Sequence, residues 1–199
     1  MKLKEIIYFT LPLVLWPLSF IVFKSYFIYA VTISTFIFAL TSIVWFKDYI
    51  TWFKGKASII FLAGVIGSII LYLMFFVGNV AASITGMGVS VNNVYFMIGK
   101  NNFLVPFLLP VIGIFEEMYW RGGMQGFVKK RFKFFSNMPW LFTTAYYSLI
   151  HIATLNPILP LAALFVGIVT SLLADRYGIF ASMLTHIIWI EAIVVFFPL

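Results

Sequence analysis

Residues 57–77, ASIIFLAGVIGSIILYLMFFV, decide the fold class because they form a long apolar run without a charged side chain. A helix needs about 20 apolar residues to cross the hydrocarbon core of a bilayer, and this run reaches that length. Lys54 and Lys56 precede the run, and a more polar stretch with several Gly and Asn residues, 78–102, follows it. The run therefore predicts a membrane-spanning helix with one basic and one polar flank.

Similar apolar runs lie on both sides of this one, separated by charged or turn residues. Together they predict seven spans, at residues 6–23, 26–46, 57–77, 103–127, 140–155, 158–174 and 179–197. The first run exceeds the apolar region of a cleaved signal peptide, so we expect it to be retained as a helix. The stretch 78–102 is too polar to span and predicts an external loop with a short interfacial helix. The predicted fold is an all-α, polytopic transmembrane helical bundle.

Composition agrees with a membrane protein and excludes several soluble classes. Hydrophobic residues make up 63% of the chain and charged residues only 10%, whereas soluble domains carry roughly 25% charged residues. The net charge of +7 is spread between apolar runs instead of over a polar face, so we expect the lipid bilayer as a partner and no nucleic acid. Cysteine is absent, which excludes disulfides, a thiolate nucleophile and Cys-ligated metals.

The basic residues also predict how the chain is oriented, because Lys and Arg gather on the cytosolic side of membrane proteins. With a cytosolic N-terminus and seven spans, only Lys24 and Lys100 fall outside. The cytosolic side then holds Lys2, Lys4, Lys47, Lys54, Lys56, Arg121, Lys129, Lys130, Arg131, Lys133 and Arg176. We expect one membrane domain, 1–199, in which 1–102 supplies N-terminal helices and the external loop, and 103–199 carries the chemistry.

Ionisable side chains inside the predicted spans are the candidates for function. Each costs at least about 2.5 kcal/mol in a bilayer on insertion scales, so an unpaired one indicates a purpose. Glu117 and Arg121 are four residues apart with Glu first, the favourable order for an ion pair along a helix. Glu116 points about 100° away from Glu117 and is therefore free to face another helix.

The depths of three ionisable residues indicate that they can meet. Counted from the predicted cytosolic helix ends at a rise of 1.5 Å per residue, Glu116, His151 and His186 lie roughly 20, 18 and 12 Å deep. Three helices would thus bring one carboxylate and two imidazoles to similar depth. The alternative is that these groups only hydrogen-bond helices to one another.

The same residues carry a resemblance to the CAAX protease and bacteriocin-processing (CPBP) family. Residues 116–122, EEMYWRG, resemble its EExxxR motif, and Tyr147 with His151 resembles FxxxH with Tyr in place of Phe. Residues 174–186, which lead to His186, resemble the third family region. The resemblance covers about residues 103–190. One departure is Ile190, where the family often has Asn.

The resemblance implies an intramembrane endopeptidase that uses a glutamate. Glu116 would be the general base, His151 would position the water, and His186 would stabilise the oxyanion. Glu117, Arg121, Tyr147 and Trp189 would support the site. Trp189, Thr185, a protonated Glu191, and a backbone or imidazole N–H remain as donors to replace the missing Asn. No cofactor is expected; a zinc ion held by Glu116, His151 and His186 is the alternative.

Other functions stay open at this point. Buried Glu and His also mark proton-coupled transporters, and Ile190 would suit a catalytically inert immunity or scaffold protein of the same fold. The expected partner is a peptide or protein substrate, with a C-terminal sorting tail or a leader peptide as candidates. The small size and short loops favour an integral protein of a prokaryotic cell membrane.

Overall fold

The computed structural model describes residues 2–99 and 102–199, and the described chain is helical with no strand. Its α-helices are α1 (Leu3–Pro17), α2 (Phe27–Phe46), α3 (Ala57–Ile84), α4 (Gly88–Ile98), α5 (Val105–Glu117), α6 (Gln125–Arg131), α7 (Pro139–Ile150), α8 (Ile158–Tyr177) and α9 (Ile179–Glu191). Three π-helical segments, η1 (Leu18–Val22), η4 (Met118–Met124) and η7 (Ala192–Phe196), continue α1, α5 and α9. Short 3₁₀ turns are η2 (Lys24–Tyr26), η3 (Lys47–Tyr49), η5 (Lys133–Phe135) and η6 (His151–Thr154). The all-α class is confirmed.

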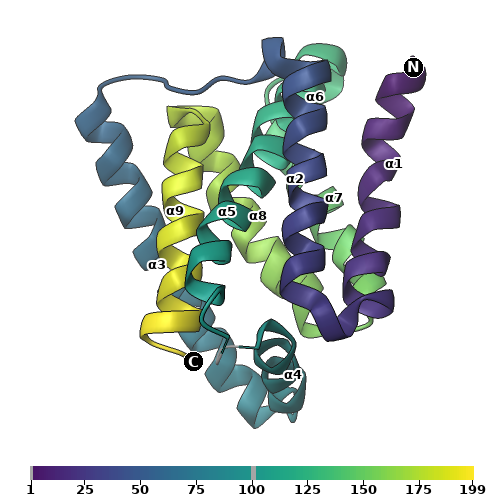
Figure 1. The fold of residues 1–199 in the computed structure, drawn as a ribbon. Coiled ribbons are helices and arrows are strands. Elements are labelled where there is room, and N and C mark those ends of the chain that lie inside the picture. The colour runs from purple at the N-terminus through teal and green to yellow at the C-terminus, as the bar shows by residue number, and fades with distance from the viewer. Residues whose placement is uncertain (1, 100–101) are drawn as a thin grey trace.

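The long helices stand side by side as a bundle, with α4 at one end and α6 at the other (Figure 1). α9 is central, because it packs against α3, α5 and α8. α7 packs against α8, and α2 packs against α5. The N-terminus lies at the end of the bundle opposite α4 (Figure 1). This arrangement brings residues from α1, α5, α7 and α9 to one interior region.

Within the described residues, five helical stretches are long and apolar enough to cross a membrane: Leu3–Val22, Lys24–Tyr49, Ala57–Ile84, Ile158–Tyr177 and Ile179–Phe196. The other two predicted spans are helical as well but do not belong to these five. The segment from α5 into η4 carries three charged side chains, and α7 with η6 ends at Thr154. The count of seven and the cytosolic N-terminus therefore stay predictions. Lys100, one of the two basic residues assigned to the outside, is not among the described residues.

The segment after residue 77 differs in part from the prediction. α3 continues to Ile84, beyond the predicted end of its span, because Val80 and the small residues after it extend the apolar helix. The expected short helix follows as α4. The predicted short helix is thus present, but the connection before it is shorter than expected, and its position at the membrane interface stays a prediction.

Small residues in α3 allow α8 and α9 to approach closely. A Cβ added to Gly67 would lie 2.6 Å from both Leu173 Cδ1 and Thr185 Oγ1, and one added to Gly64 would lie 2.8 Å from Leu184 Cδ2. The Thr185 hydroxyl donates a hydrogen bond to the Gly64 carbonyl at 2.9 Å. Both glycines thus permit the close contact, since small residues let membrane helices approach backbone to backbone.

Replacing Gly67 by alanine is expected to lower the free energy of unfolding by about 1–3 kcal/mol, because the added methyl overpacks the contact with α8 and α9. Gly78→Ala on the same helix is the matched control, since a Cβ there meets nothing within 4 Å. Thermal unfolding in detergent would measure both variants. Equal midpoints for the two variants would contradict a tight contact at Gly67.

At the end of the bundle where α6 lies, charged side chains connect the loop before α3 to α8. Lys129 Nζ donates to the Asp175 carboxylate at 2.6 Å, and Lys54 Nζ donates to the Asp175 backbone carbonyl at the same distance. Partial burial and the nearby Lys129 lower the pKa of Lys54, and Asp175 opposes that shift. These contacts fix the entry of α3 beside the turn between α8 and α9.

Candidate active site

One cavity of about 570 Å³ contains all three residues that were predicted to meet. Glu116 from α5, His151 from η6 and His186 from α9 line it, together with Tyr147 and Trp189. The remaining wall is mostly apolar and comes from η1, α2, α3, α4, α5 and α8, with Phe20, Val31, Phe75, Val94, Leu109 and Val166 among its residues. The cavity is therefore an apolar chamber with a group of polar side chains on one wall.

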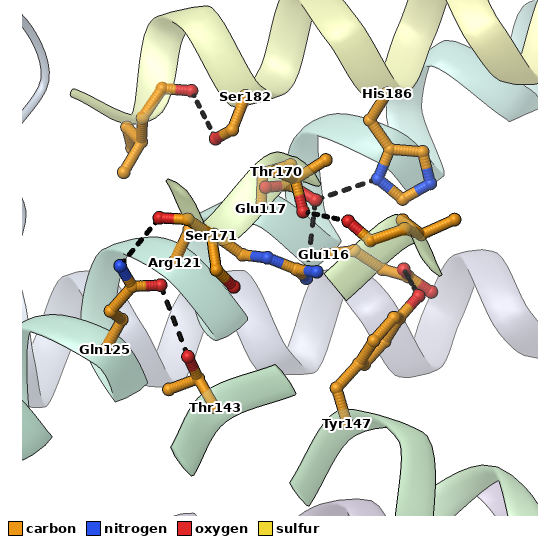
Figure 2. Close-up of polar contacts among 12 residues, drawn as sticks. Glu116, Glu117, Arg121, Gln125, Thr143, Tyr147, Thr170, Ser171, Ser182 and His186 are labelled. Carbon is orange, nitrogen blue, oxygen red and sulfur yellow. Dashed lines mark hydrogen bonds and ion pairs between the residues drawn. The ribbon is translucent and has the colours of Figure 1, made fainter. Parts of the chain in front are cut away.

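Glu116 is held at this wall by a tyrosine from another helix. Its side chain is buried, and Oε2 accepts a hydrogen bond from the Tyr147 hydroxyl at 2.8 Å. Figure 2 shows the Tyr147 ring rising from α7 toward the Glu116 carboxylate. Glu116 occupies the last turn of α5, directly before the π-helical segment η4. π-Helical turns occur often at functional sites because they rotate side chains away from the regular helical face.

Glu117 lies between two positively charged or protonatable partners. Its Oε1 is 3.4 Å from Arg121 NH1 and 2.9 Å from His186 Nδ1. All three side chains are buried, and they lie together in Figure 2. The predicted Glu117–Arg121 pair is confirmed. The hydrogen bond to His186 was missed, because spacing along one helix does not reveal which other helix faces it.

This contact determines how His186 can act. The Glu117 carboxylate accepts the Nδ1 proton, which fixes the ring orientation and leaves Nε2 for another partner. Nε2 offers a lone pair when the imidazole is neutral and an N–H donor when the imidazole is protonated. His186 can therefore offer either a lone pair or an N–H group to a molecule in the cavity.

Arg121 contacts Glu117 directly and is linked to Glu116 through Tyr147. Its guanidinium carbon lies 4.6 Å from the centre of the Tyr147 ring, close enough for a cation–π contact. Its nitrogens have no hydrogen-bond partner among the described residues. Arg121 thus contacts Glu117 as an ion pair and Tyr147 through its ring, and Tyr147 in turn holds Glu116.

His151 already uses both ring nitrogens in this structure. Nδ1 lies 2.7 Å from the Tyr147 carbonyl oxygen, and the Trp16 indole nitrogen lies 3.1 Å from Nε2. A carbonyl only accepts and an indole N–H only donates, so the imidazole is neutral with its proton on Nδ1. The water-positioning role predicted for His151 would require one of these two hydrogen bonds to open.

Trp16 is a site residue that the sequence did not reveal. It lies on α1, far from the recognised motifs, and it is almost fully buried at 1% exposure. Within an apolar first span, an aromatic residue looks like lipid-facing or packing bulk. Only the arrangement of α1 against η6 shows that its N–H meets an imidazole.

The candidate donors for the missing Asn differ in position. Ile190, at the Asn position, lines the cavity and is apolar. Thr185 uses its hydroxyl on the Gly64 carbonyl. Trp189 lines the cavity, and its indole N–H has no hydrogen-bond partner among the described residues. Among the named side chains, Trp189 is therefore the cavity-lining residue with an unpaired, buried N–H.

The arrangement does not fit the zinc alternative. In the described parts of the chain, no group of three His, Asp or Glu side chains is arranged to hold a metal ion. A zinc ligand must offer a free lone pair, whereas His151 already uses Nε2 to accept from Trp16 and Nδ1 to donate to the Tyr147 carbonyl.

Comparison with known families agrees with the motifs. The family model described as Type II CAAX prenyl endopeptidase Rce1-like matches residues 99–190, just under half of the chain. No curated protein matches significantly, and neither does any solved structure. The matched segment contains Glu116, Glu117, Arg121, Tyr147, His151, His186 and Trp189. Residues 99–190 therefore match the CPBP family of intramembrane proteases, to which the Rce1-like endopeptidases belong.

Proposed function

We propose that this protein is a glutamate-dependent intramembrane endopeptidase that hydrolyses a membrane-associated peptide or protein. The observation that carries the proposal is that Glu116 and His186 line one cavity while Tyr147 and Glu117 hold them in place. A base and an oxyanion donor on opposite sides of a peptide bond are the two groups that hydrolysis by activated water requires.

In this proposal Glu116 removes a proton from a water molecule as the water oxygen attacks the peptide carbonyl carbon. The carbonyl oxygen becomes an oxyanion, and His186 Nε2–H donates a hydrogen bond to it. Glu116 then returns the proton to the leaving nitrogen as the C–N bond breaks. Trp189 is the second donor, in the place of the family Asn. Glu117 keeps His186 oriented, and Arg121 offsets the charge of Glu117.

The lining of the cavity supports an apolar substrate segment. Nearly all of the wall away from the polar group consists of aliphatic and aromatic side chains, and such a wall favours apolar residues on either side of the cleaved bond. A C-terminal sorting tail or a leader peptide of a small prokaryotic protein would supply them. The protein itself is an integral membrane protein, and we propose the prokaryotic cell membrane as its location.

Replacing Tyr147 by phenylalanine is expected to lower kcat about tenfold or more, because Glu116 loses a hydrogen bond that orients its carboxylate. The matched control is Tyr146→Phe, whose hydroxyl donates to the Phe9 carbonyl on α1 instead. Initial rates on a common substrate would compare the two variants. A Tyr147→Phe rate equal to that of the parent would show that Glu116 does not need this contact.

The proposed function can be tested before a substrate is identified. The purified protein in lipid nanodiscs would be incubated with solubilised membrane proteins of its host, and mass spectrometry would record new peptide termini. We expect termini that appear with the parent and are absent with Glu116→Gln. If no terminus appears and proteoliposomes instead show pH-driven uptake of a solute, the protein is a transporter.

Ile190 favours a second candidate function, an inert immunity or scaffold protein on the same fold. Its apolar side chain faces the cavity where the family often has an amide donor. An inert protein would need neither a base nor an oxyanion donor. Full rescue of a deletion phenotype by Glu116→Gln would support this function, whereas failure to rescue by a stably folded Glu116→Gln protein would support the protease.

A further inference from the structure

Trp16 connects the N-terminal helix to the candidate site through a directed chain of hydrogen bonds. The indole N–H donates to His151 Nε2 at 3.1 Å, and His151 Nδ1–H donates to the Tyr147 carbonyl at 2.7 Å. The hydroxyl of the same tyrosine donates to Glu116 at 2.8 Å. Each bond points one way, toward Glu116. Trp16 lies outside residues 99–190, which the family model matches.

The surroundings keep Trp16 in this position. Its ring contacts Phe38 of α2 at a centroid distance of 5.0 Å and Phe20 of η1 at 6.0 Å. The His151 ring meets it edge-on at 5.7 Å. Trp16 is followed by Pro17 and then by the π-helical segment η1, so the regular helix ends beside it. The indole is thus packed on several sides, and its one polar atom is aimed at His151.

We propose that Trp16 is a positioning residue of the active site, which holds His151 as the neutral, Nδ1-protonated imidazole and so fixes Tyr147 and Glu116. The tautomer of a histidine is set by the hydrogen bond that its other nitrogen makes. With Nε2 bonded to Trp16, His151 links α1 to the end of α7. The catalytic consequence rests on the proposed function, whereas the hydrogen bond itself does not.

The test of the hydrogen bond is nitrogen NMR on protein labelled with ¹⁵N-histidine. The chain has two histidines, so a His151→Gln sample assigns the remaining ring to His186. In the parent we expect His151 Nε2 to carry no proton. Its ¹⁵N resonance should lie upfield of that of an unprotonated imidazole nitrogen that accepts no hydrogen bond. Trp16→Phe keeps an aromatic ring but removes the donor, and the Nε2 resonance is expected to move downfield.

The matched control is Trp120→Phe, because Trp120 is equally buried and its indole N–H has no hydrogen-bond partner among the described residues. This variant is expected to leave the His151 resonances unchanged. A proton on Nε2 in the parent, or identical His151 spectra in the parent and Trp16→Phe, would overturn the proposal. If Trp16→Phe fails to fold, the parent spectrum alone decides between these outcomes.

Kinetics test the positioning role separately. With a substrate identified, Trp16→Phe is expected to lower kcat about tenfold, the effect of losing one buried hydrogen bond, at unchanged KM. If Trp16→Phe shows the NMR shift but has a kcat equal to or above that of the parent, the hydrogen bond exists but does not position the active site. That result would overturn the positioning role of Trp16. If the parent cleaves no substrate but the NMR shift is seen, the proposed function fails and the Trp16–His151 contact stands.

Discussion

Replacing Glu116 by glutamine is expected to lower turnover by about 10²–10⁴-fold, the range that a positioned general base contributes. Glutamine keeps the shape of the side chain and can still accept the hydrogen bond from Tyr147. It cannot take a proton from water, so the loss should fall on kcat and leave KM almost unchanged. Single-turnover cleavage of a substrate peptide in nanodiscs would measure this loss.

Glu191→Gln is the matched control for this variant. Glu191 ends α9, is only partly buried and does not line the cavity. The same change of acid to amide should therefore leave turnover as it is in the parent. Undiminished cleavage by Glu116→Gln would remove Glu116 from the mechanism, and a similar loss in both variants would point to a general effect on the membrane fold.

His186→Ala is expected to lower kcat by about 10²–10³-fold, because one preorganised donor at an oxyanion has this effect when removed. The fold should persist, since Glu117 keeps its ion pair with Arg121. The thermal unfolding midpoint in detergent would check this point. A large fall in the midpoint would show that His186 serves mainly as structural support for Glu117.

The double variant Glu116→Gln, His186→Ala tests whether the two residues act in one step. Groups that work as a unit show losses that do not add. We expect the double variant to be about as slow as the slower single variant. If the fold-reduction in kcat of the double variant equals the product of the two single reductions, the two side chains act in separate steps. That result would contradict the proposal that both act when water attacks the carbonyl.

Much of this protein could be read directly from its sequence. The apolar run 57–77 and its counterparts predict membrane helices because every backbone polar group must be paired within a helix in lipid. The buried glutamates and histidines identified the candidate site because charged groups in lipid are costly. The four-residue spacing of Glu117 and Arg121 predicted their ion pair, which depends on one helix alone.

Only the tertiary structure decided which helices meet and which atoms face each other. His186 forms a hydrogen bond with Glu117, and Trp16 of α1 donates one to His151. Both bonds depend on how separate helices are rotated and packed. The periodicity of a sequence shows on which face of its own helix a side chain lies. It does not show which other helix packs against that face. The hydrogen bonds between helices, and hence the roles open to each imidazole, are set by that packing.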